Sequence, residues 1–139
     1  MRAAARAEIA RLDRDRAIRA AVADATSQVK VALLVHLTQP RVSQIVAATD
    51  EPRPGFSGAT PTEIAQRFAA GELDEAQAID ELGRWDYEQP PAVDEYDGLW
   101  EPGPGTWLDV EDALSHGLIT EEVYAGALEL QAAKMKGDG

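Results

Sequence analysis

Two segments rich in proline and glycine divide this chain of 139 residues and limit how much of it any one helix can contain. The first, TDEPRPGFSGATP at 49–61, and the second, YEQPPAVDEYDGLWEPGPGTW at 87–107, both interrupt helix-forming sequence. Proline lacks the N–H that a helix interior needs, and glycine loses the most entropy on ordering. We therefore expect two domains, 1–50 and 61–139, joined by a linker over 51–60, with the second break forming an irregular strap.

The charge is divided in the same way. The chain has a net charge of −12, but residues 1–54 contain nine Lys/Arg and six Asp/Glu, whereas residues 55–139 contain four and nineteen. The two parts therefore carry +3 and −15. A part with excess positive charge suits a polyanion, and an acidic part suits a basic partner. The alternative is that the acidic side chains only form the solvated surface of helices and bind no partner.

Several classes of function are disfavoured by the composition. The chain has no cysteine and only two histidines, His36 and His116, which argues against a metal site, and it shows no apolar run of about 20 residues for a membrane span. The N-terminus is too charged for a secretory signal. Because the sequence has neither a glycine-rich phosphate loop nor a nucleophile motif, we expect no enzyme activity and no cofactor. We expect a cytoplasmic protein without membrane contact.

Three helices are expected in the first part, at about 15–23, 27–37 and 39–48. Thr38 is placed to cap the third helix, and Pro40 falls in its first turn, where a missing N–H is harmless. Val42 and Ile45 recur at helical spacing and should face inward. The outward face is then short and polar, with one arginine, and such groups suit base edges and phosphates.

The residues before these helices, MRAAARAEIARL, are also helix-forming. Ala5, Ile9 and Leu12 make a narrow apolar stripe that favours dimerisation. Two alternatives remain open for this segment: it is a basic arm that contacts DNA, or it is a frayed, solvated end of the chain.

The stretch RDRAIRAAVADATSQVKVALLVHLTQPRVSQIVAA, residues 14–48, resembles the tri-helical helix-turn-helix domain of bacterial, actinobacterial-type regulators. By the docking of that family, the start of the third helix would contact the bases of double-stranded DNA. The resemblance assigns this role to Thr38, Gln39, Arg41, Ser43 and Gln44, and we add Lys30 from the preceding helix. It also places Val31, Ala32, Val35, Leu37, Val42 and Ile45 in the core.

The chain departs from this family in three places. His36 stands in the turn where the family usually has glycine, and histidine tolerates a positive φ better than a β-branched residue does. Ala25 also stands where glycine is frequent. Leu33 and Leu34 occupy positions that are often charged, so we expect the N-terminal helix or a second subunit to cover them.

The second part contains an internal sequence repeat. FAAGELDEAQAIDEL aligns with ALSHGLITEEVYAGAL at an offset of 46, which pairs Gly71 with Gly117 and Asp74 with Thr120. Each copy predicts a helix that ends at a left-handed glycine, followed by a helix capped by Asp or Thr. We expect helical hairpins at 61–84 and 107–134, and hence an all-α chain. Such hairpins resemble bacterial oligomerisation or protein-binding modules.

Aromatic residues are concentrated in and around the second break, where acids are interleaved with them. Aromatic side chains anchor protein interfaces because they bury much area with few rotatable bonds. Two interpretations remain open, which are that they bind a partner protein and that they complete the core of their own domain. The residues concerned are Trp85, Tyr87, Tyr96, Trp100 and Trp107.

These features together predict a homodimeric, sequence-specific transcriptional repressor. The size, the divided charge and the acidic–aromatic strap resemble the antitoxin of a toxin–antitoxin system, in which an acidic part binds a basic toxin while the DNA-binding domain represses the operon. A phage or host repressor without a toxin fits almost as well. The alternative from another class is an interaction protein in which the first three helices serve assembly.

Overall fold

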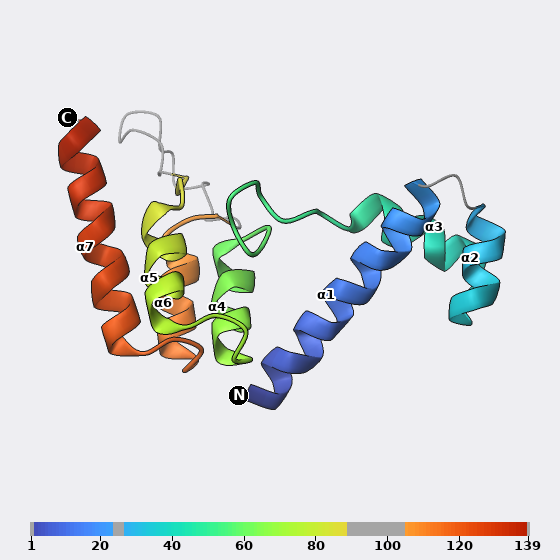
Figure 1. Ribbon diagram of the computed structural model, residues 1–139, viewed down its shortest axis with the longest axis horizontal. Helices are drawn as coiled ribbons and strands as arrows, with labels where there is room; N and C mark the ends of the chain where they lie inside the picture. The colour runs from blue at the N-terminus through green and yellow to red at the C-terminus, as the bar shows by residue number, and fades with distance from the viewer. Residues whose placement is uncertain (1, 24–26, 89–104, 139) are drawn as a thin grey trace, which may run out of the picture. The chain divides into compact units, whose positions relative to one another are not determined.

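The computed structural model describes residues 2–23, 27–88 and 105–138, and its elements there are all α-helices (Figure 1). This confirms the prediction of an all-α chain for the described residues. Among them, the only strand-like pairing is an isolated bridge between Glu88 and Thr106. The helices are α1 Arg2–Ala23, α2 Gln28–Val35, α3 Gln39–Ala48, α4 Pro61–Ala69, α5 Glu75–Arg84, α6 Leu108–Ser115 and α7 Glu121–Asp138.

The chain divides into two compact units, which we describe separately. The N-terminal unit comprises residues 7–51, and the C-terminal unit comprises residues 52–139 together with residues 1–6. The first residues of α1 belong to the C-terminal unit, where the Nε of Arg2 donates a hydrogen bond to the carbonyl of Ala69 (3.2 Å). The boundary after residue 51 lies close to the expected one, but residues 1–6 were expected in the N-terminal domain.

The N-terminal unit is organised around a small apolar core. Its buried side chains come from α1, α2 and α3, and Leu37 and Val46 pack against them from partly buried positions. The hydroxyl of Ser27 accepts the N–H of Lys30 at the start of α2, and the hydroxyl of Thr38 accepts the N–H of Arg41 at the start of α3. These bonds satisfy helix N–H groups that have no partner within the helix. The buried residues are Ile18, Val31, Ala32, Val42 and Ile45.

The structure corrects two expectations about α2 within the single chain. Val35, which was assigned to the core, is 36% exposed. Leu33 and Leu34 were expected to be covered by the N-terminal helix or by a second subunit; the N-terminal helix does not cover them, since within this chain they are 74% and 69% exposed, and cover by a second subunit stays a prediction. The helix turns its opposite side, with Val31 and Ala32, toward the core. Because α2 is only eight residues long, its core side holds few side chains and the remaining apolar ones face outward.

The C-terminal unit consists of two helical hairpins, α4–α5 and α6–α7 (Figure 1). The first helix of each ends at a glycine with positive φ, Gly71 (φ 88°) and Gly117 (φ 74°). The following N–H groups, of Glu72 and Leu118, each donate to a carbonyl five residues earlier, which is the bond of a Schellman motif. Asp74 then accepts the N–H of Gln77 to begin α5 (2.7 Å). The offset of 46 in the sequence thus corresponds to the same turn formed twice.

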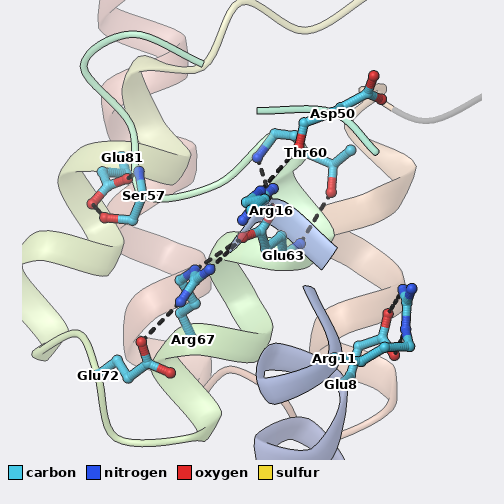
Figure 2. A network of polar contacts seen from close by, with 11 residues as sticks. Glu8, Arg11, Arg16, Asp50, Ser57, Thr60, Glu63, Arg67, Glu72 and Glu81 are labelled. Atoms are coloured by element: carbon cyan, nitrogen blue, oxygen red, sulfur yellow. Dashed lines mark hydrogen bonds and ion pairs between the residues drawn. The ribbon is translucent and has the colours of Figure 1, made fainter. Parts of the chain in front are cut away.

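Residues 51–60 were expected to be a linker, but the structure places residues from 52 onward in the C-terminal unit. The ring of Phe56 meets the ring of Trp85 edge to face, with 4.8 Å between centroids. The hydroxyl of Ser57 donates to the buried carboxylate of Glu81 (2.8 Å), as Figure 2 shows. A sequence rich in proline and glycine resists helix formation, but it still packs where its side chains find partners.

A buried ion pair fixes the first hairpin. Glu63 and Arg67 are one helical turn apart on α4, and both are less than a tenth exposed. The Nε and Nη2 of Arg67 lie 2.9 and 2.8 Å from the Oε2 of Glu63, and Arg67 also pairs with Glu72 beyond the turn (Figure 2). The other oxygen of Glu63 accepts the N–H of Ala59 (2.9 Å), so the network also holds the segment before α4.

Among the described helices, α5 and α7 form the most extensive pair, and a small residue permits their approach. A Cβ added at Gly83 of α5 would lie 2.6 Å from the Cβ of Leu130 on α7. Because the Cβ of Leu130 is fixed to its own backbone, the helices themselves would have to move apart. Gly83 is therefore required at this crossing by space rather than by backbone conformation.

We expect Gly83→Ala to lower the free energy of unfolding of the C-terminal unit by about 1–3 kcal/mol, as overpacking of a close-packed core does. Gly137→Ala on α7 is the matched control, because a Cβ there meets nothing within 4 Å and alanine favours the helix. Denaturant unfolding followed by tryptophan fluorescence measures both, since all three tryptophans lie beyond residue 52. Equal stability of the two variants would mean that the crossing is not tight.

None of the described helices combines the length and the apolar character that crossing a membrane requires.

Candidate functional site

Helix α3 buries its apolar side in the core of the N-terminal unit, so its polar side faces solvent. Val42 and Ile45 are buried at 0% and 3% exposure, and this fixes the rotation of the helix. The residues predicted from the sequence are all exposed, and they extend from the capping residue through the first two turns. They are Thr38, Gln39, Arg41, Ser43 and Gln44.

These side chains supply a mixed set of hydrogen-bonding groups. The guanidinium of Arg41 donates to the Oε1 of Gln44 at 3.4 Å, so the two side chains lie together on the surface. Amide groups both donate and accept, and the guanidinium presents several donors in a plane. Such a face can form hydrogen bonds and ion pairs with a ligand that has polar edges and negative charge, and it lacks the apolar side chains that would bind an apolar ligand.

The sequence that forms α2 and α3 carries positive charge only. Between Ser27 and Thr49 the sequence contains Lys30 and Arg41 but no aspartate or glutamate. Both cations stand in the first turn of a helix, beside N–H groups that already give that end a partial positive charge. Unit 7–51 as a whole carries six basic and six acidic residues, so the positive character is local to α2 and α3.

Gln28 was missed by sequence reasoning and belongs to the same site. The Nε2 of Gln39 donates to the Oε1 of Gln28 at 2.9 Å, which joins the first turns of α2 and α3. A signal for it exists in the sequence: SQVK at 27–30 and TQPR at 38–41 share the order of hydroxyl cap, glutamine, any residue and cation. Gln28 thereby limits the orientations that the amide of Gln39 can take.

The turn between α2 and α3 depends on His36. This residue has φ 59° and ψ 40°, in the left-handed region, and it is the only described non-glycine residue with positive φ. Its N–H and that of Leu37 both bond to the carbonyl of Ala32 and so close the end of α2. The turn sets the angle between the helices, and histidine holds it at a cost in backbone energy.

We expect His36→Gly to raise the free energy of unfolding of the N-terminal unit by about 0.5–1 kcal/mol. Glycine adopts the left-handed conformation without the strain that histidine has there, and its larger loss of conformational entropy on folding offsets only part of this gain. His116→Gly is the matched control, since its φ of −86° gives glycine no advantage. Thermal unfolding followed by circular dichroism at 222 nm compares the two. A loss of stability in His36→Gly would show that the imidazole makes a favourable contact that outweighs the strain.

The basic side chains of α1 are largely engaged within the helix or its own unit. Arg11 pairs with Glu8 (2.6 Å) and with the buried Asp15 (3.0 Å), and the hydrogen bond to Glu8 is the main cause of a raised Arg11 pKa. Arg16 donates to the carbonyl of Asp50 (2.9 Å), and Arg19 donates to that of Thr49. These bonds secure the end of α3 to α1.

The aromatic residues assigned to a partner divide into three groups. Trp85 and Tyr87 are 2% and 7% exposed and belong to the core of the C-terminal unit, so for these two the alternative interpretation applies. Trp107 is half-buried, with edge contacts to Tyr87 at 5.1 Å and a tilted contact to Tyr124 at 5.8 Å. The two remaining predicted residues, Tyr96 and Trp100, lie outside the described residues.

Burial changes the ionisation of two groups near this core. Desolvation raises the pKa of the Tyr87 phenol strongly, and the nearby Asp109 adds to the shift, so the hydroxyl remains a donor to the carbonyl of Leu82. Desolvation also raises the pKa of the Asp109 carboxyl, although the N–H of Gly105 (2.8 Å) opposes the shift. Both groups serve the packing around residues 105–110.

A groove of about 260 Å³ lies beside Trp107 in the C-terminal unit. Its walls are the aromatic rings of Tyr87 and Trp107 and a stripe of α7 in which Leu128 and Met135 are 45% and 62% exposed. Gln131 forms part of the wall, and its amide donates to the carbonyls of Gly83 and Trp85 (2.8 Å each). This groove is an apolar feature of the acidic unit that is open to another molecule.

Within the described ranges, no group of His, Cys, Asp or Glu side chains is arranged to hold a metal ion.

No protein-family model matches the chain, and searches of curated proteins and of solved structures give no significant match.

Proposed function

We propose that α1–α3 form a helix-turn-helix domain and that the protein is a sequence-specific transcriptional repressor. The observation that carries this proposal is the exposed face of α3, in which Arg41 and Gln44 are hydrogen-bonded to each other, Gln39 is also exposed, and residues 27–49 contain no aspartate or glutamate. A major-groove helix needs this chemistry, because amides contact adenine and arginine contacts guanine through paired hydrogen bonds.

The arrangement around α3 supports the proposal further. The bond between Gln28 and Gln39 orients one base-contacting amide, and the N-terminus of α2 with Lys30 offers a cationic site for a backbone phosphate. Ser43 completes the polar face of α3. In this scheme Arg41 and the glutamines specify the sequence, whereas Lys30 contributes affinity that falls with salt concentration.

We infer that the acidic C-terminal unit binds a basic protein, as in an antitoxin that regulates its own operon. Residues 55–139 carry a net charge of −15, which favours encounter with a cationic partner and disfavours DNA. Trp107 and the apolar stripe of α7 offer the contact area that charge alone does not provide. A repressor without a toxin partner would use the same N-terminal domain.

A second candidate is an assembly protein that does not bind DNA. It is favoured by the outer face of α2, where Val29, Leu33 and Leu34 are 59%, 74% and 69% exposed. A helix exposing three adjacent large apolar side chains is typical of an interface. In this case the polar face of α3 would have no role in recognition.

The test is a mobility-shift titration of the full chain with a DNA fragment taken from directly upstream of its own coding sequence. A shuffled fragment of equal composition serves as the control, and both are measured at 50 and 200 mM salt. The repressor proposal expects at least tenfold preference for the upstream fragment and weaker binding to both fragments at high salt. Equal binding to both fragments, or none at 50 mM salt, would overturn it in favour of the assembly protein.

A further inference from the structure

The groove beside Trp107 contains a polar group whose orientation is fixed by the backbone. Gln131 lines the groove and is only 9% exposed. Its Nε2 donates to the carbonyls of Gly83 and Trp85 (2.8 Å each), which uses both N–H groups of the amide. Because carbonyls only accept hydrogen bonds, the amide cannot be reversed. Among the described residues no donor bonds to its Oε1, so this oxygen is an acceptor left for a ligand in the groove.

The charge around the groove favours a ligand that is a cationic donor. Residues 85–133 supply five of the six side chains that line the groove, and they contain twelve Asp/Glu but no Lys or Arg. Of the two lysines of α7, Lys134 is paired with Asp86 at 3.5 Å, and Lys136 stands in the last turn. Hydrogen bonds from charged donors are also stronger than those from neutral ones. The groove therefore suits a lysine or arginine side chain.

The aromatic rings of the same unit indicate which of these two side chains fits better. The guanidinium of Arg53 lies over the ring of Trp85 at 4.1 Å, and that of Arg84 lies over the ring of Phe56 at 4.5 Å. Within the described part of the chain no guanidinium covers the ring of Trp107, which forms a wall of the groove. A planar guanidinium can stack on such a ring and still direct its N–H groups at an acceptor, so arginine is favoured over lysine.

We propose that this groove binds an arginine side chain of a basic partner protein, with the guanidinium against Trp107 and donating to the Oε1 of Gln131. The alkyl part of the arginine lies along Leu128 and Met135, which are 45% and 62% exposed. The identification of the ligand's source as a partner protein rests on the proposed role of the acidic unit, whereas the arginine site itself does not. Such a site adds recognition of one side chain to a general attraction between opposite charges.

The first test is an NMR titration of the ¹⁵N-labelled full chain with the capped peptide Gly-Ser-Arg-Ser-Gly. Three control peptides carry citrulline, lysine or leucine in place of the arginine. One side chain is a single anchor of an interface, so we expect a dissociation constant of about 1 mM and titrate to about 10 mM. The arginine peptide should shift the indole signal of Trp107 and the side-chain amide signals of Gln131. It should bind at least about fivefold more tightly than the citrulline peptide, which keeps the shape but lacks the charge.

The second test fills the groove from within the chain. Met135→Arg places a guanidinium at a lining position, and Ala133→Arg is the matched control, because it adds the same charge to the same helix at a position that does not line the groove. Both positions are exposed, so circular dichroism should show both variants to be folded. We expect Met135→Arg to weaken binding of the arginine peptide by about tenfold, and Ala133→Arg by less than about twofold at physiological salt.

Three results would overturn the arginine site. They are unchanged groove signals up to the highest peptide concentration, equally tight binding of any control peptide, and equal losses in the two α7 variants. Equal binding of the leucine peptide would mean that the groove takes an apolar side chain. Equal losses in the variants would mean that only the net charge of the unit matters.

The titration also separates this inference from the proposed function, since it contains neither DNA nor a partner protein. If the arginine and lysine peptides shift signals elsewhere in the acidic unit but none in the groove, the arginine site is wrong and the proposed basic partner stands. Conversely, arginine binding in the groove of a protein that does not prefer its upstream DNA would sustain this inference and contradict the repressor.

Discussion

Arg41→Ala combined with Gln44→Ala is expected to abolish preferential DNA binding while leaving the fold unchanged. Each good base contact contributes about 1–3 kcal/mol of discrimination, and the two side chains touch each other, so we expect a joint loss of about 2–4 kcal/mol. This corresponds to roughly thirtyfold or more in affinity for the specific fragment. Both residues are exposed, so the free energy of unfolding should change by less than about 0.5 kcal/mol.

Fluorescence anisotropy with a labelled upstream fragment measures this loss. Lys136→Ala is the matched control, because it removes an exposed cation from α7 and should affect binding little. Arg41→Lys distinguishes two possible contacts of this residue. If Arg41 contacts guanine, lysine cannot form the paired hydrogen bonds and the affinity falls, whereas if Arg41 contacts a phosphate, the lysine variant keeps most of the affinity. Wild-type affinity in the double variant would remove α3 from the recognition surface.

The largest loss of stability is expected for Glu63→Ala. The carboxylate of Glu63 makes two close contacts with the buried Arg67 guanidinium, which also pairs with Glu72, whose side chain is 44% exposed. Removing one member of a buried pair leaves the charge of the other poorly compensated, which costs about 3–5 kcal/mol. The substitution also leaves the N–H of Ala59 without its acceptor and so loosens the segment that precedes α4.

Urea unfolding followed by tryptophan fluorescence tests this expectation on the C-terminal unit alone. Asp80→Ala is the matched control, because Asp80 and Arg84 form a pair with the same spacing but about half exposed, for which less than about 1 kcal/mol is expected. Replacing the pair together, by Glu63→Leu with Arg67→Met, should restore much of the stability. Similar losses for Glu63→Ala and Asp80→Ala would mean that the pair is accessible to water.

Features set by neighbouring residues were predictable from the sequence. Thr38, Asp74 and Thr120 all cap the helices that follow them, and His36 adopts the left-handed conformation that its place in the turn requires. These signals are local, since a cap or a turn depends on a few consecutive residues. The repeated turn at Gly71 and Gly117 was recognisable for the same reason.

Features set by contacts between distant residues were not predictable. Phe56 and Ser57 lie in a segment whose composition indicates a linker, and only the position of Trp85 and Glu81 in space explains why it is packed. The role of Gln28 likewise depends on the angle that the turn at residue 36 imposes. Trp85 and Tyr87 adjoin the acidic strap in sequence, yet the end of α5 directs them into the core.

The central claim is that the polar face of α3 contacts DNA, and NMR spectroscopy of the ¹⁵N-labelled full chain tests it most directly. Amide and side-chain signals are recorded with and without the upstream fragment and compared with the shuffled one. We predict that the largest specific changes fall on Thr38–Gln44 and on the side chain of Gln28, with little change in α5 and α7. Changes confined to the outer face of α2 or to the C-terminal unit, with none in α3, would contradict the claim.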